Sequence, residues 1–134
     1  MGKSLIQTVN QSTQSVENNS IISLGSVLRR YGCGCKMSGN AIEVIGQGYY
    51  KIDVCVTLVP TTTNDVTVAL FENGVQIPGA IATGAVATVG NSLTLPIITT
   101  IRKPCCYNNA SSITCVLVNE ASTVSNISVR VTND

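Results

Sequence analysis

Strict alternation of apolar and polar side chains in one long stretch limits, more than any other feature, what this chain can fold into. The stretch is YYKIDVCVTLV, residues 49–59. One set of alternate positions is apolar: Tyr50, Ile52, Val54, Val56 and Leu58. The other set is mixed: Tyr49, Lys51, Asp53, Cys55 and Thr57. A period of two residues is that of a β-strand with one buried face. We therefore predict a long strand that covers a core.

Further segments rich in Val, Ile and Thr predict that the rest of the chain also forms strands. DVTVALFENG repeats the alternation, and its Asn73-Gly74 pair fits a tight hairpin turn. In the VQIPGAIAT segment that follows, Pro78-Gly79 marks a break or an edge strand. The remaining strands are expected in SIISLGSVLRR, NAIEVIG, SLTLPIITT, SSITCVLVN and VSNISVRVT. No segment has the period of a helix, so the pattern predicts an all-β sandwich or barrel.

The length and the pattern predict one domain preceded by a polar segment. A chain of 134 residues suits a single core. Residues 1–20 are polar and weakly patterned, so we expect an amino-terminal arm that either orders against a neighbour or frays. Residues 21–134 are then the β-sandwich domain. The start lacks the apolar core of a secretory signal peptide, and no apolar run approaches a membrane span, so we expect synthesis in the cytoplasm and no membrane partner.

Charged residues are few and give the chain little net charge. They make up 11% of the chain, with a formal net charge of +1, whereas about a quarter charged is typical. Lys and Arg are scattered along the sequence, so we expect no nucleic acid and no anionic lipid as partner. A surface of Ser, Thr, Asn and Gln suits a protein covered by copies of itself or by a larger assembly, because low charge favours association. A monomer with a Thr/Asn-rich face is the alternative.

The residue types that most catalysis needs are missing or isolated. The chain has no histidine, which removes the commonest general base and the Ser-His and Cys-His pairs. Glu43 and Asp53 could approach one another across neighbouring strands as paired carboxylates. Isolated acids on strands and turns are more often solvated. No phosphate loop, nucleophile elbow or EF-hand pattern is present. We therefore predict no catalytic residue and no cofactor.

Four of the six cysteines lie in two loop-like segments, as Cys33 with Cys35 and Cys105 with Cys106. Four thiolates could hold zinc, but structural sites usually leave two or more residues between paired ligands, so we predict no metal. A disulfide between the segments would need α-carbons about 5.5 Å apart, and would contribute nominally about 4 kcal/mol by closing a loop of roughly 70 residues. A cytosolic start argues against oxidation, whereas a particle released by lysis meets an oxidising exterior. Disulfide and free thiols both remain open.

The two other cysteines fall inside strand patterns. Cys115 shares a face with Ile113 and Leu117, so we expect a buried, inert thiol. Cys55 lies opposite the apolar face of its strand, beside Tyr49 on the same side. That side is expected to meet a second layer or an interface between subunits, which makes Tyr49 and Cys55 candidate interface residues.

Several segments, in their order along the chain, resemble the trimeric jelly-roll superfamily of tumour necrosis factor and the complement globular heads. GQGYYKIDVCVTLV matches the Gly-x-Tyr-x-aliphatic motif at the start of a central strand, through Gly48, Tyr50 and Ile52. VALFENGVQIPGA is similar to the strand, Asn-Gly turn and small-residue strand of bacterial members. KPCCYNNASSITCVLVNEASTVSNISVRVT is similar to the last three strands. The chain lacks the Phe-x-Gly that often precedes the last strand, and it has no counterpart of the cytokines' receptor-binding loops.

The resemblance implies an antiparallel jelly-roll β-sandwich that forms a homotrimer. Among bacterial and phage members, a stand-alone unit without a collagen-like stalk is similar to small decoration and fibre proteins of virions. The expected function is therefore a capsid decoration protein that binds the outer face of a phage capsid, with the major capsid protein or another virion protein as partner. A surface or fibre-tip module that recognises host glycans or proteins is the alternative, and its binding loops would be Thr61–Asn64 and Gly84–Gly90.

Overall fold

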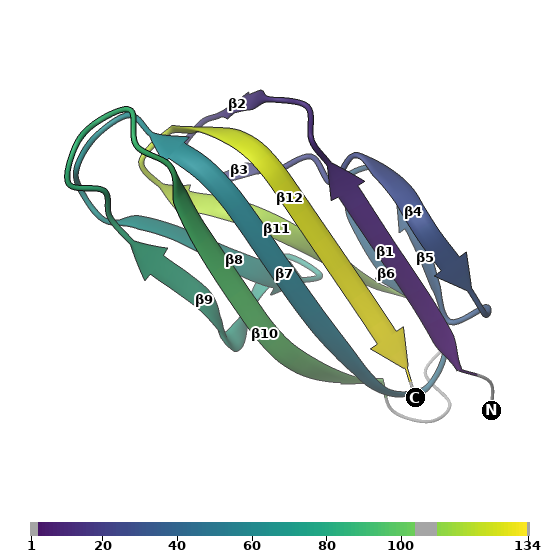
Figure 1. Cartoon of the computed structure of the whole chain (residues 1–134). Coiled ribbons are helices and arrows are strands. Elements are labelled where there is room, and N and C mark those ends of the chain that lie inside the picture. The colour runs from purple at the N-terminus through teal and green to yellow at the C-terminus, as the bar shows by residue number, and fades with distance from the viewer. Residues whose placement is uncertain (1–2, 104–109, 134) are drawn as a thin grey trace.

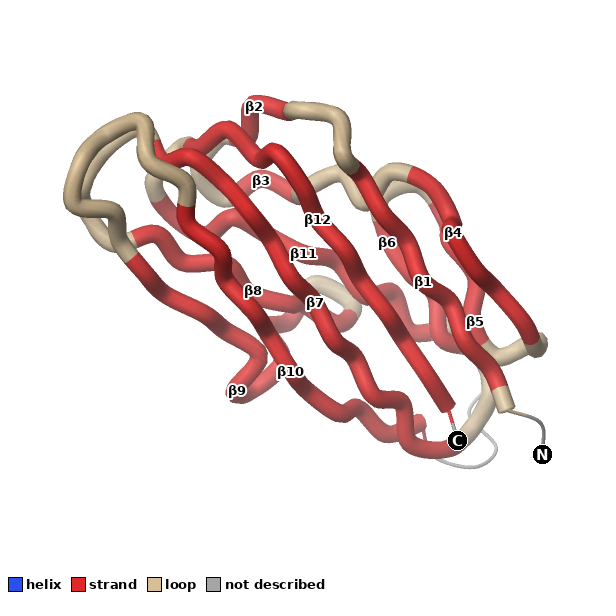
Figure 2. Tube along the Cα trace, viewed as in Figure 1, coloured by secondary structure: helices blue, strands red, loops and turns tan. Residues whose placement is uncertain are grey.

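Two antiparallel β-sheets, stacked face to face, make up the computed structural model of the chain, which describes residues 3–103 and 110–133 (Figure 1). The described residues form strands and loops without a helix (Figure 2), and so contain no helical segment that could cross a membrane. The strands are β1 (Ser4–Asn10), β2 (Gln14–Val16), β3 (Ser20–Ile21), β4 (Ser26–Tyr31), β5 (Cys35–Ser38), β6 (Ala41–Val44), β7 (Gly48–Pro60), β8 (Val66–Glu72), β9 (Val75–Gly84), β10 (Leu93–Lys103), β11 (Ser111–Asn119) and β12 (Ser122–Asn133). The prediction of an all-β sandwich is confirmed.

Each sheet is built from strands that are far apart in the sequence. In sheet A the strand order is β10-β7-β12-β1-β4, with the short β2 also paired to β12. In sheet B the order is β5-β6-β11-β8-β9, with the short β3 also paired to β11. The core lies between the sheets and consists almost entirely of Val, Ile, Leu and Ala side chains. The first and last described residues lie at the same end of the sandwich, and the β7–β8 and β9–β10 loops lie at the other (Figure 1).

The alternation that predicted the long central strand also predicted which of its faces is buried. Tyr50, Ile52 and Val56 in β7 have no exposed surface, and Val54 is 3% exposed. The intervening side chains, from Tyr49 to Thr57, are exposed or half-buried on the other face of the sheet. Burial on one face only is what a period of two residues requires of a strand.

The expected hairpin turn joins β8 to β9. Glu72 pairs with Val75, so the loop contains only Asn73 and Gly74. Both residues have positive φ, 53° and 84°, as the tight turn that fits the twist of a hairpin requires. The Asn73 side chain also accepts a hydrogen bond from the Ser112 backbone N–H at 2.9 Å, which ties the turn to β11.

The amino-terminal segment is part of the sandwich, which corrects the expectation of an arm over residues 1–20. Strand β1 lies inside sheet A, paired with β12 over its whole length and with β4 on its other side. Ile6 and Thr8 have no exposed surface, and Ser4 is 4% exposed. The sequence pattern was weak because two of the three buried residues at alternate positions are hydroxyl residues, so the contrast between the faces of β1 is small.

Candidate functional site

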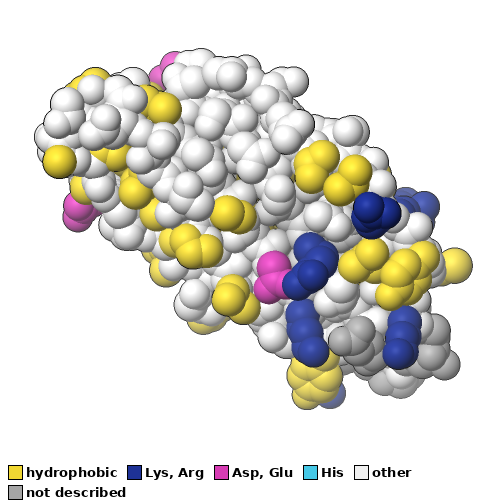
Figure 3. All heavy atoms as spheres, viewed as in Figure 1, with side chains coloured by type: hydrophobic (Ala, Val, Ile, Leu, Met, Phe, Trp, Pro, Cys, Tyr) yellow, Lys and Arg dark blue, Asp and Glu magenta, His cyan; other side chains and the backbone are white. Residues whose placement is uncertain are grey.

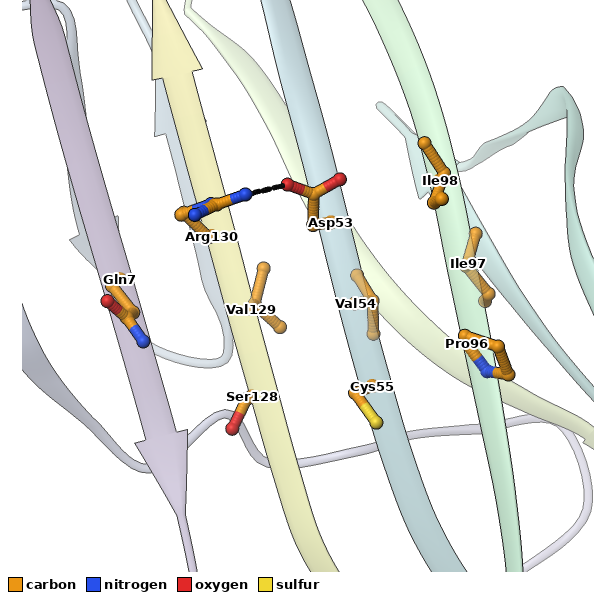
Figure 4. Close-up of a pocket in the computed structure, with 10 residues that line it drawn as sticks. All are labelled: Gln7, Asp53, Val54, Cys55, Pro96, Ile97, Ile98, Ser128, Val129 and Arg130. Carbon is orange, nitrogen blue, oxygen red and sulfur yellow. Dashed lines mark hydrogen bonds and ion pairs between the residues drawn. The ribbon is translucent and has the colours of Figure 1, made fainter.

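On the outer face of sheet A, the side chains lie in rows across the strands. One row runs from Gln7 on β1 through Arg130 on β12 and Asp53 on β7 to Ile98 on β10. The next row places Ser128 and Cys55 beside Pro96 on the same strands: Ser128 on β12, Cys55 on β7 and Pro96 on β10. These rows line a shallow hollow of about 370 Å³ (Figure 4). We define this surface, from Gln7 to Ile98, as the outer face.

One ion pair lies in the middle of the outer face. Arg130 Nη2 lies 2.5 Å from Asp53 Oδ2, and Arg130 Nε donates to the same oxygen at 3.2 Å (Figure 4). The two charges therefore compensate each other on the sheet. The rest of the hollow is lined by uncharged side chains. Such a surface can be covered by a protein partner at a small desolvation cost.

The candidate interface residues both lie on this side of sheet A. Tyr49 is 64% exposed, and Cys55 is also exposed. Sequence reasoning missed Ile98, which at 78% is the most exposed large hydrophobic side chain among the described residues. Its segment, LTLPIITT, has apolar residues at both Ile97 and Ile98, so the alternation alone does not say which of them faces outward.

The family-motif residues lie at the start of β7, where they close one end of the core. Tyr50 is fully buried, and its hydroxyl donates a hydrogen bond to the Gly46 carbonyl oxygen at 2.9 Å. Burial raises the pKa of Tyr50, and the nearby Cys35 thiol raises it further. Gly48 has a φ of 123°, which favours glycine, and Ile52 lies in the core. The motif therefore has a structural position, away from the outer face.

Cysteines of the first loop pair have different environments. Cys33 is exposed, whereas Cys35 is 1% exposed. Burial raises the pKa of Cys35 to about 11, although the Arg30 guanidinium acts in the opposite direction. The pair lies beside a hollow of about 370 Å³ lined by residues that include Ser4, Tyr50 and Asn133. Cys105 and Cys106 lie outside the described residues, so a disulfide between the two loop pairs and its alternative, free thiols, both stay predictions.

Cys115 is buried between the sheets, and the candidate carboxylate pair is separated by the sandwich. Cys115 is 1% exposed, and burial raises the pKa of its thiol to about 12. The idea that Glu43 and Asp53 approach across neighbouring strands is wrong, because Glu43 lies on β6 in sheet B and Asp53 on β7 in sheet A. Glu43 is instead 3.9 Å from Lys36. Within the described part of the chain, no three Cys, Asp or Glu side chains come together as metal ligands.

Basic residues gather at the end of the sandwich that holds both chain ends, although they are scattered in the sequence. Figure 3 shows them together on the face in view. All eight belong to this half, as the strand register shows: Lys3, Arg29, Arg30, Lys36, Lys51, Arg102, Lys103 and Arg130. The described acidic side chains there are Glu43, Asp53 and Glu72, whereas the opposite half has Glu17, Asp65 and Glu120 and no Lys or Arg. The small net charge therefore conceals a marked separation of charge.

Solved structures with the same fold include cytokine, complement and phage proteins. Murine APRIL superposes with a TM-score of 0.76 at 11% identity, covering 99% of this chain and all of that one. The globular domain of zebrafish complement 1qA gives 0.69 at 6% identity, with 94% of each chain covered. Vertex protein P5 of phage PRD1 gives 0.63 at 10% identity, covering 97% of this chain and 96% of that one. The sequence matches no protein-family model and no curated protein. The fold is thus the jelly roll of these proteins, as predicted.

Proposed function

We propose that the chain is a structural protein of a virion, a homotrimer that binds the outer face of a phage capsid and reinforces it. The observation that carries the self-association is the outer face of sheet A. It is broad, the charges of Arg130 and Asp53 on it compensate each other, and Ile98 is 78% exposed there. Ile98 lies beside Pro96 and Cys55, which are also exposed, and a contiguous group of exposed apolar side chains is typical of a surface that a partner subunit buries.

A ring of three needs two different surfaces that fit each other, because a threefold contact is head-to-tail. The outer face supplies one of these surfaces. The edge formed by β10 and β9 supplies the other, with Ile81, 45% exposed, on β9. In this arrangement the edge of each subunit packs against the face of the next. The structural likeness to tumour-necrosis-factor-like and complement domains supports the arrangement.

The virion role is supported by the likeness to PRD1 vertex protein P5 over nearly the whole chain and by the low content of charged residues. A trimer placed where capsid subunits meet contacts several of them at once. Simultaneous contacts raise the total affinity well above that of each one. A small protein can thereby hold neighbouring capsid subunits together while acting as an adhesive and not as an enzyme.

The test examines virions whose genome encodes this chain, with and without the gene. We expect threefold density on the outer capsid surface by electron cryo-microscopy and a lower temperature of genome release without the gene. Deleting residues 1–20 is unsuitable as a variant, because it removes β1 from the middle of sheet A. Absence of the chain from purified virions by mass spectrometry would contradict the capsid role, whereas the trimer is tested separately in solution.

The second candidate function is a fibre-tip module that binds host glycans or proteins through loops. Its favouring observation is the ordered loop cluster at the end opposite the chain termini. Glu120 accepts a hydrogen bond from the Thr62 hydroxyl at 2.9 Å and one from the Asn64 side chain at 3.5 Å. A loop fixed in this way is pre-organised for binding. Loss of cell attachment in a Thr62→Ala variant that still trimerises would favour this candidate.

A further inference from the structure

Strand β4 is an open edge of sheet A with a basic character. It pairs with β1 on one side and with no other described strand on its second side. All six of its residues are exposed, and they include Val27 (41%), Leu28 (52%) and Tyr31 (54%). An edge strand presents unpaired backbone N–H and C=O groups that can accept an additional strand.

Two other edge strands of the sandwich are blocked or already assigned. β10 contains Pro96 and β9 contains Pro78, and a proline cannot donate a hydrogen bond to an added strand. These two strands also form the edge that the proposed trimer uses. β5 is an edge of only four residues. Among the described strands, β4 is therefore the longest edge that is free of proline.

The two arginines of β4 have different positions, which the pairing with β1 defines. Arg30 pairs with the buried Ile6, so its side chain lies on the inner side. There its Nε donates a hydrogen bond to the Cys35 carbonyl oxygen at 2.9 Å, which fastens β4 to the neighbouring β5. Arg29 pairs with Gln7, so it lies on the outer side of the sheet. The edge is thus held in place by one arginine and presents the other.

Charge selects the strand that could pair with this edge. β1 and β4 contain no acidic residue, whereas Lys3, Arg29 and Arg30 lie on or next to them. Charged edge residues commonly prevent two copies of a strand from pairing, since like charges then face each other. The same charges attract a strand with carboxylates opposite them. A second copy of β4 is therefore disfavoured, and an acidic segment is favoured.

From this geometry we infer that β4 is a strand-addition site for an extended, acidic segment of a partner protein. The segment pairs with Ser26–Tyr31 through its backbone and places carboxylates opposite Arg29, on the outer side of sheet A. Its apolar side chains alternate with the carboxylates and contact Val27, which pairs with the buried Thr8 on the other side of the strand. Exposed apolar residues and a free backbone edge favour a protein segment over a nucleic acid, which would engage the basic end mainly through its phosphates. This inference goes beyond the proposed function, since it requires neither a trimer nor a capsid.

The test uses the full chain and an eight-residue peptide of alternating Val and Glu with blocked termini. Two control peptides carry Lys in place of Glu, or N-methyl groups on alternate backbone nitrogens. We expect the acidic peptide to bind at low salt and to slow hydrogen exchange at residues 26–31. We expect the Lys peptide not to bind, and N-methylation to weaken binding at least about tenfold, because strand addition depends on backbone hydrogen bonds.

Arg29→Glu is the decisive variant, and Arg102→Glu is its matched control. Both residues are exposed and lie in the basic half, but Arg102 is on β10 at the opposite edge of sheet A. Arg29→Glu should lower the affinity for the acidic peptide about tenfold or more. Arg102→Glu should lower it less than about threefold, because the contact with the peptide is local. Equal losses in both variants, tighter binding of a dT oligonucleotide or a sulfated polysaccharide, or no peptide binding at all would each overturn the inference.

Discussion

Replacing Ile98 by Asp should dissociate the proposed trimer without unfolding the subunit. Ile98 is 78% exposed in the isolated chain and pairs with Asp53, so the substitution lowers the free energy of unfolding of one subunit by no more than about 1 kcal/mol, mainly through repulsion between the two carboxylates. Burial of an Ile side chain in an interface contributes about 2 kcal/mol. A closed ring contains three such contacts, so the loss is about 6 kcal/mol for the trimer before the cost of desolvating three carboxylates is added.

That loss has a measurable effect on the concentration at which the trimer assembles. At 1.4 kcal/mol for each factor of ten, about 6 kcal/mol lowers the assembly constant roughly ten-thousandfold. The midpoint concentration varies with the square root of this constant for a monomer–trimer equilibrium. The midpoint should therefore rise at least about a hundredfold. Sedimentation equilibrium over a concentration series measures the shift, and circular dichroism checks that the subunit stays folded.

Ile21→Asp is the matched control for this experiment. Ile21 is 49% exposed, and it lies on β3, which pairs with β11 in sheet B. It belongs to neither surface of the proposed contact, so its replacement should leave the midpoint unchanged. A wild-type chain that stays monomeric at every concentration would refute the reasoning. So would an Ile98→Asp variant that assembles like the wild type, or equal dissociation of the two variants.

Three further predictions concern the core. Tyr50→Phe removes the hydrogen bond of 2.9 Å to the Gly46 carbonyl oxygen and should lower the free energy of unfolding by about 1–2 kcal/mol in urea titration; an unchanged midpoint would contradict this. Thr8→Val should raise stability by up to about 1 kcal/mol, because the Thr8 hydroxyl is buried without a partner among the described residues, and a lower melting temperature would disprove it. The Cys115 pKa is raised from 9.0 to about 12, so the unfolded thiol ionises first as pH rises and stability falls above pH 9. In the Cys115→Ala variant, the free energy of unfolding measured by urea titration should fall less steeply between pH 9 and 11 than in the wild type, by about 1.4 kcal/mol per pH unit. Equal slopes for the two proteins would exclude Cys115 as a cause.

Prediction from the sequence succeeded where burial produces a strong local contrast. The alternation in β7 defined both the strand and its buried face, because every second residue from Tyr50 to Leu58 is large and apolar. The Asn73-Gly74 turn was predictable because its backbone conformation demands these residue types. Both features depend on neighbours in the sequence, which a single chain displays directly.

Prediction failed where burial does not follow side-chain polarity. Residues 1–20 are weakly patterned in part because Ser4 and Thr8 of β1 carry hydroxyls, so the sequence predicts an arm, yet both side chains are buried in the sandwich. The sequence allows Glu43 and Asp53 to approach one another across neighbouring strands, whereas they belong to different sheets. Neither error could be detected without knowing which strands pair. The disulfide between the loop cysteines is still a prediction.

By itself the sequence determined a strand-built, charge-poor chain with one strongly apolar face on its central strand. The pairing of the strands decided everything that depends on residues far apart in the chain. It placed Gln7, Arg130, Asp53 and Ile98 in one row on the outer face, and it gathered all the basic residues at one end. The physical reason is that alternation reports only the local division into inside and outside, whereas a surface is assembled by hydrogen bonds between strands that are far apart in the sequence.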